Sequence, residues 1–107
     1  MTNEAHIVVL VTCPPDGAAE LARAVVSDQL AACANILSGV RSIYRWKGEI
    51  CDDEEALLVI KTRASLFERL RARMATLHPY DVPEIIALPL TAGHAPYLDW
   101  ITRNTGA

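Results

Sequence analysis

Two short apolar runs constrain the fold of this chain more than any other feature. Ile7–Thr12 is rich in β-branched residues, and Ala56–Ile60 is apolar at every position. Neither run alternates with polar residues, which is typical of strands that are covered on both faces. We therefore expect two central strands in a sheet, with something to cover each face of that sheet.

The rest of the chain supplies the expected helices. Asp16 is a good N-cap for a helix that runs to about Cys33. Apolar residues recur at helical spacing over Phe67–Leu77, and His78–Pro79 is expected to end this helix, because proline disfavours helical geometry in the residue before it. A short last helix is expected to start near Pro96.

Two further extended segments complete the expected sheet. Asn35–Trp46 is a long extended stretch with a bend or bulge at Ser38–Gly39. Lys47–Gly48 then makes a turn toward the second apolar run, which predicts a hairpin. Ile85–Leu88 is a fourth strand, and Pro89 closes it because proline cannot donate to a sheet ladder.

The resulting order is β-α-β-β-α-β followed by a short helix, which is that of the split βαβ or ferredoxin-like fold. We therefore predict an α+β protein with one antiparallel sheet and two helices on one face, in a single domain that spans residues 1–107. Because the helices leave the other face of the apolar strands open, self-association is expected to cover it.

Composition and charge argue against several classes of function. The net charge is −3 and the basic residues are scattered, which argues against nucleic acid as a partner. No apolar stretch approaches the roughly 18 residues of a membrane span, and no secretory signal is visible, so we expect a cytoplasmic protein that does not contact a membrane. The three cysteines, Cys13, Cys33 and Cys51, are widely separated, which argues against a structural zinc site or a disulfide framework.

His78, Cys13 and Glu84 are the candidate metal ligands. His78 lies at a rigid corner before Pro79, where a neutral imidazole can bind copper, zinc or nickel. Cys13 follows the first strand, where a thiolate can bind Cu(I) or zinc, and Glu84 can return to the same place as a ligand or a hydrogen-bond acceptor. The alternatives are that Cys13 is a small buried apolar residue and that His78 is a helix-terminal residue bonded to a carbonyl.

Lys61, Trp46 and Tyr80 indicate a second kind of site. Lys61 ends a buried strand, where an ammonium group is unfavourable unless it is paired or faces a polar cleft. Together with Trp46 and Tyr80 as aromatic walls, Lys61 predicts a pocket for a small anion at a subunit boundary. Alternatively, Lys61 and Glu84 form a structural ion pair at that boundary.

Several short segments occur in a characteristic order between about Ile7 and Arg103. They are Val11–Pro14, Leu30–Asn35, Ser42–Gly48, Ile60–Thr62, His78–Tyr80, Glu84–Pro89 and Tyr97–Trp100. In this order and spacing, which cover nearly the whole chain, they resemble the CutA family of divalent-cation tolerance proteins.

The resemblance implies a tight homotrimer of ferredoxin-like subunits whose long hairpins pair across subunits. It also implies a trimer architecture similar to that of PII-type signalling proteins, and a link to tolerance of divalent cations and to copper binding. Some bacterial members carry a cysteine and a second histidine, both associated with copper binding, where this chain has Val11 and Leu77, whereas His78 is kept.

We therefore predict a trimeric protein that binds a metal ion such as copper, or a small ligand, at a subunit cleft and contributes to metal homeostasis. No cofactor is expected to be required. The alternative is a structural or PII-like signalling trimer with no metal role. An enzyme is not predicted, because Cys13 with His78 is the only conceivable nucleophile–base pair and the chain has no glycine-rich phosphate loop.

Overall fold

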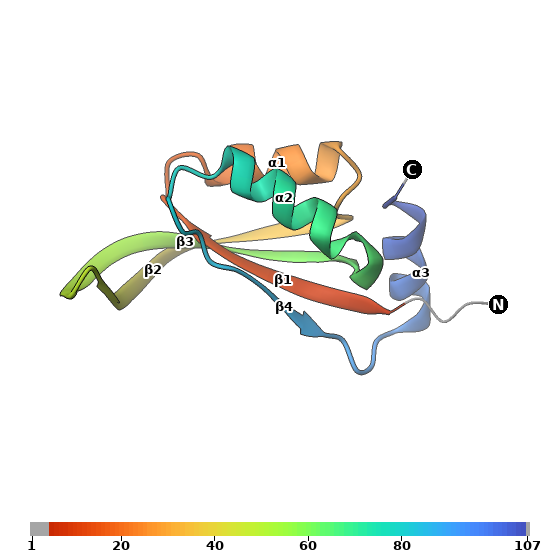
Figure 1. Cartoon of the computed structure of the whole chain (residues 1–107). Coiled ribbons are helices and arrows are strands. Elements are labelled where there is room, and N and C mark those ends of the chain that lie inside the picture. Colours follow the sequence, from red (N-terminus) through yellow and green to blue (C-terminus); the bar gives the residue numbers. More distant parts are fainter. Residues whose placement is uncertain (1–4, 107) are drawn as a thin grey trace.

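The two apolar runs form the inner strands of one four-stranded sheet (Figure 1). The structure, a computed structural model, describes residues 5–106. Its elements in chain order are β1 (His6–Cys13), α1 (Ala18–Ser27), β2 (Cys33–Trp46), β3 (Glu49–Arg63), a 3-10 turn (Ala64–Leu66), α2 (Phe67–Leu77), β4 (Ile85–Pro89) and α3 (Ala95–Arg103). Neighbouring strands pair antiparallel in the order β2-β3-β1-β4, which confirms the predicted ferredoxin-like topology.

One face of the sheet is buried under α1 and α2 (Figure 1). Val9 pairs with Ile60 and Val11 with Leu58 across β1 and β3, and all four side chains are fully buried. The helices pack apolar side chains onto them, chiefly Leu21, Val25, Leu70 and Met74. Each such side chain contributes about 1.5–3 kcal/mol when it is fully buried, so this layer is the main source of stability.

The opposite face of the sheet is also apolar but is only partly covered within one chain. It carries the alternate residues of the inner strands and their partners on β4, of which Ile86 and Leu88 are 50% and 53% exposed. We call this surface the open face, and its apolar residues are Val8, Leu10, Leu57, Val59, Ile86 and Leu88. The apolar character of both faces is as predicted from the two runs, and coverage of the open face by another copy stays a prediction.

The first helix is shorter than the sequence predicts. It begins after Gly17, which has a φ of 98°, rather than at an Asp16 cap. The helix ends at Ser27, because Gln29 has a left-handed φ of 59° and the backbone N–H of Leu30 turns back to donate to the Val25 carbonyl at 3.0 Å. The backbone N–H of Ala32 then donates to the carbonyl of Lys61 at 3.0 Å, which starts the sheet pairing. Cys33 begins β2 and is half-buried there, which corrects the expectation that the first helix runs to about this residue.

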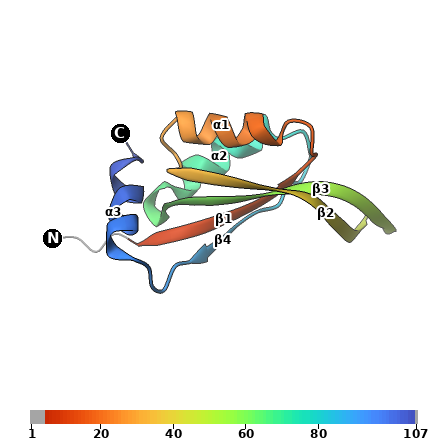
Figure 2. The ribbon, with the colours of Figure 1, turned by 180° about the vertical axis from the view of Figure 1, so that it is seen from behind.

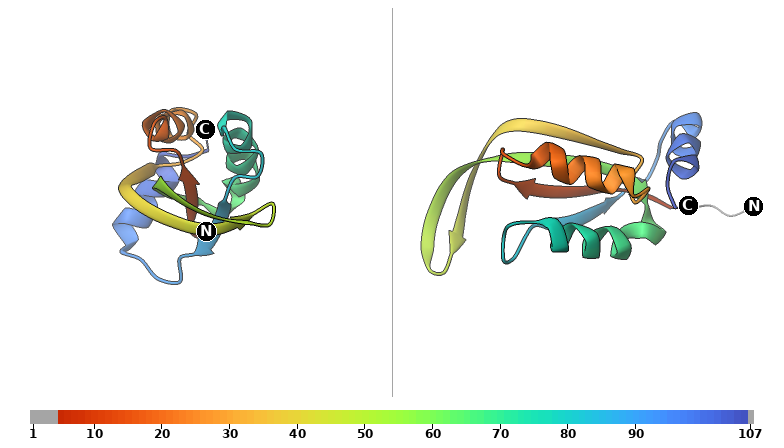
Figure 3. Two further views of the ribbon diagram at one scale, coloured as in Figure 1. Left: turned by 90° about the vertical axis from the view of Figure 1, so that its left-hand side faces the viewer. Right: turned by 90° about the horizontal axis from the view of Figure 1, so that it is seen from above.

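The β2–β3 hairpin extends beyond the helices and the other strands (Figures 2 and 3). Its pairing register shifts between Leu37 and Val40, as the predicted bend at Ser38–Gly39 requires. Lys47 and Gly48 close the hairpin with φ values of 49° and 79°, which confirms the predicted turn. The hairpin makes the molecule elongated, with extents of 50 × 25 × 22 Å.

The C-terminal helix packs at the opposite end of the molecule from the hairpin tip (Figure 1). His6 Nε2 on β1 lies 2.8 Å from Thr102 Oγ1, and the Arg63 guanidinium donates to the Thr105 hydroxyl at 2.9 Å. These contacts leave the hairpin end of the sheet clear of α3. None of the helices within residues 5–106 has the length and continuous hydrophobicity that crossing a bilayer requires.

Candidate functional site

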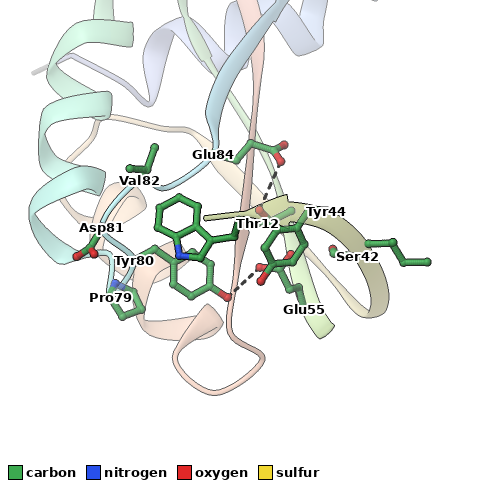
Figure 4. Close-up of a pocket in the computed structure, with 11 residues that line it drawn as sticks. Thr12, Ser42, Tyr44, Glu55, Pro79, Tyr80, Asp81, Val82 and Glu84 are labelled. Carbon is green, nitrogen blue, oxygen red and sulfur yellow. Dashed lines mark hydrogen bonds between the residues drawn. The ribbon is translucent and has the colours of Figure 1, made fainter. Parts of the chain in front are cut away.

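A groove of about 610 Å³ opens at the end of β1 that lies nearest the hairpin. The hairpin forms one wall, and the loop from α2 to β4 forms the other (Figure 4). The lining residues are Thr12, Ser42, Ile43, Tyr44, Trp46, Glu55, Pro79, Tyr80, Asp81, Val82 and Glu84. Aromatic and acidic side chains therefore dominate its surface.

Glu55 and Tyr80 join the two walls of the groove. Glu55 is only 5% exposed, and the Tyr80 hydroxyl donates to its carboxylate at 2.9 Å (Figure 4). Burial, together with the hydrogen bond to Glu55, raises the pKa of Tyr80 to about 12. The phenol therefore keeps its proton at neutral pH, and the bond ties the loop to the hairpin.

His78 is buried behind the loop, and both of its ring nitrogens have protein partners. Nε2 lies 2.8 Å from the carbonyl oxygen of Thr12, and the backbone N–H of Tyr80 donates to Nδ1 at 3.1 Å. Because the Thr12 carbonyl can only accept, the proton of the neutral ring is on Nε2. The histidine thus fixes the loop against the end of β1, with its ring 4.7 Å from that of Tyr80.

Cys13 is fully buried beside the groove. Burial and the nearby Glu55 carboxylate both raise the pKa of its thiol, so the protonated form is favoured at neutral pH. Metal binding and nucleophilic attack both need a thiolate. This thiol has the environment of a small core residue.

Glu84 is the member of the predicted metal set that faces solvent. Its carboxylate is exposed and accepts one long hydrogen bond, 3.5 Å, from the Thr12 hydroxyl (Figure 4). His78, Cys13 and Glu84 therefore lie around Thr12 at one end of β1. Within residues 5–106, however, no group of three or more His, Cys, Asp or Glu side chains is arranged to hold a metal ion.

The predicted anion pocket is divided by the structure. Trp46 and Tyr80 line the groove, whereas Lys61 is not among its lining residues. Lys61 lies on β3 opposite Cys33, and its ammonium group donates to the Asn35 side chain. Within one chain, the aromatic walls therefore belong to an acidic groove and the lysine lies elsewhere on the sheet.

Two groove residues had not been predicted from the sequence. β3 runs through the acidic stretch Asp52–Glu55 and buries the Glu55 carboxylate. Tyr44 lines the same groove, and its hydroxyl donates to Asp53 at 2.6 Å, which raises the pKa of this tyrosine. The position of Glu55 directly before the apolar run was the available signal.

The charge of the groove favours a cation. Of the described residues that line it, the charged ones are Glu55, Asp81 and Glu84, and all are acidic. The hydroxyls of Thr12, Tyr44 and Tyr80 add oxygen atoms to the same surface. The site can therefore attract a metal ion or an organic cation more readily than the predicted anion.

Known proteins are similar to this chain in both sequence and fold. The family model described as CutA1 divalent ion tolerance protein matches residues 7–104. The divalent-cation tolerance protein CutA of Thermus thermophilus is 51% identical over 100 residues, which cover 92% of this chain and 97% of that protein. The human protein CutA is 49% identical over 96 residues, which cover 89% of this chain but 54% of the human protein.

Solved structures extend this similarity to three dimensions. The crystal structure of CutA1 from Oryza sativa superposes with a TM-score of 0.94 at 44% sequence identity, covering 99% of this chain and 98% of that one. The divalent cation tolerance protein of Thermus thermophilus has a TM-score of 0.91 at 50% identity, covering 94% of this chain and 99% of that one. The backbone that carries the long hairpin and the groove is therefore similar to the backbones of these solved proteins.

Proposed function

This chain belongs to the CutA1 divalent ion tolerance family, and from that premise we propose that it works as a homotrimer that binds a divalent metal ion at a cleft between subunits and contributes to metal homeostasis. The observation that supports this most is the acidic groove, whose charged lining residues are all carboxylates. Metal ions are attracted to such a surface before any specific ligand is engaged.

Glu84 is the metal ligand that the groove offers most directly. Its carboxylate is exposed, and oxygen ligands of this kind suit divalent cations, Cu(II) among them. His78 must give up its bond to Thr12 before Nε2 can bind a metal, and Cys13 must lose a proton that burial retains. We infer that His78 holds the loop beside Glu84 while a neighbouring subunit supplies the remaining donors.

Native mass spectrometry, before and after addition of a small excess of Cu(II), tests this proposal. We expect a trimer that gains a stoichiometric metal adduct. Glu84→Gln should keep the trimer mass but lose the adduct, because the amide preserves the shape and removes the charge. Glu20→Gln, which alters an exposed carboxylate on α1 outside the groove, is the matched control and should bind as the unmodified protein does. An unchanged adduct with Glu84→Gln would rule out this ligand.

A trimeric scaffold without a metal role is the second candidate. The hairpin favours it, because Ile43 and Ile50 are among the most exposed large apolar residues of the described chain and suit contact with another protein. In this case the same experiment gives a trimer that takes up no copper. That outcome would reject the metal role while leaving the proposed assembly in place.

A further inference from the structure

The groove is larger and more aromatic than a metal site requires. Its volume of about 610 Å³ falls within the range of small-molecule pockets, which is about 300–1,000 Å³. Tyr44, Trp46 and Tyr80 line it, and each remains partly exposed to solvent. A bare metal ion makes no use of three aromatic side chains.

The acidic groups of the groove are spread around these aromatic residues. Figure 4 shows Glu84, Glu55 and Asp81 on different sides, with Tyr80 and Tyr44 between them. Within residues 5–106, no three of these side chains are arranged to hold one metal ion together. An elongated molecule with several positive charges can match them, and none of the described residues that line the groove is a lysine or an arginine.

The aromatic side chains suit the remainder of such a molecule. The electron-rich faces of Trp and Tyr attract organic ammonium groups, and their rings pack against methylene chains. The chain already provides one example, because the Lys47 ammonium lies 5.8 Å from the centroid of the Trp46 ring. Both phenol hydroxyls donate to carboxylates, Tyr80 to Glu55 and Tyr44 to Asp53, which holds these rings in place.

The geometry points to an aliphatic polyamine as a ligand of this groove. Its ammonium groups would pair with the exposed carboxylates of Glu84 and Asp81, and its methylene chain would lie along Trp46 and Tyr80. This inference goes beyond the proposed metal role and does not depend on it. The polyamine is recognised by aromatic walls and separated charges, whereas the metal ion is recognised by Glu84.

Titration of the 107-residue chain with spermidine tests the inference. Trp46 and Trp100 are the two tryptophans of the chain, so Trp100→Phe leaves Trp46 as the only tryptophan fluorophore. We expect spermidine to change this fluorescence saturably at constant ionic strength. The neutral 1,8-octanediol, which has a similar length, and Mg²⁺, which lacks the chain, should each bind at least about tenfold more weakly. Equal responses to spermidine and the diol, or to spermidine and Mg²⁺, would overturn the inference.

Substitutions separate the polyamine from the metal ion. Trp46→Leu should abolish spermidine binding in calorimetry while the copper adduct of the trimer is unchanged. Asp81→Asn alters an exposed loop side chain and should weaken spermidine binding by about tenfold, without the risk to the hairpin that replacing Trp46 brings. Spermidine binding that survives both substitutions would show that the groove is not the site.

Discussion

His78 shows how a single residue can support a site without being free to act in it. Its two ring nitrogens connect the end of β1 to the start of the loop, through the Thr12 carbonyl and the Tyr80 amide. The sequence predicts a rigid corner at this histidine, and both of its ring nitrogens have hydrogen-bond partners there. The direction of the ring could not be predicted, because it depends on Thr12, which is 66 residues away in the chain.

Replacement of His78 should therefore affect stability. His78→Ala leaves the Thr12 carbonyl and the Tyr80 N–H without partners at a buried position, which should lower the free energy of unfolding by about 2–3 kcal/mol. Urea unfolding measures this change in the free energy of unfolding. The protein concentration is kept fixed, because assembly shifts the apparent stability. His94→Ala, at an exposed position, is the control, and its effect should stay within about 0.5 kcal/mol. Equal effects of the two substitutions would contradict the role assigned to His78.

At the scale of secondary-structure elements, the hairpin is the feature that builds the groove. Its turn depends on two residues with positive φ, Lys47 and Gly48. At Gly48, an added Cβ would meet nothing within 4 Å, so a side chain there would clash with no neighbour. The requirement for glycine is therefore one of backbone conformation alone.

Gly48→Ala should lower the free energy of unfolding by about 1 kcal/mol, because alanine enters the left-handed region unfavourably. Gly48→Asn should have a smaller effect, since asparagine tolerates this conformation better. Thermal or urea unfolding of the two variants gives the comparison. A Gly48→Ala protein as stable as the unmodified one would show that the turn relaxes to another conformation.

A helix or strand is easiest to predict from the sequence where a local pattern of residues marks it. β1 and β3 were predictable because continuous apolar runs mark inner strands locally. The end of α1 was not, because it is set by Gln29, whose left-handed φ of 59° is uncommon for a residue other than glycine. Glu55 could not be predicted as a groove residue, because β3 runs through an acidic stretch that has the composition of a solvated loop.

At the scale of the whole molecule, the folded chain exposes more surface than is typical for its mass. Its accessible surface is 6694 Å², against about 5,900 Å² for a typical folded monomer of the same mass. Its radius of gyration is 14.5 Å, against about 13 Å for a compact domain of this length. The projecting hairpin and the open face account for this excess, and both are suited to contact with other copies of the chain.

Substitution on the open face tests this assembly. The unmodified protein should have three times the 11.7 kDa mass of the chain in light scattering coupled to size-exclusion chromatography. Leu88→Glu should give monomers, because an unpaired carboxylate resists burial in an interface. Leu88 is 53% exposed in one subunit, so circular dichroism should show that the subunit still folds.

Val26→Glu is the matched control, because this exposed apolar residue lies on α1, away from the open face, and its replacement should leave the trimer intact. If Leu88→Glu remained trimeric, the open face would not be the interface and the hairpin alone would have to hold the subunits together. If the unmodified protein were a monomer, a metal site completed by a neighbouring subunit could not form. The groove of a single chain would then be the whole site, and spermidine would remain the ligand to test.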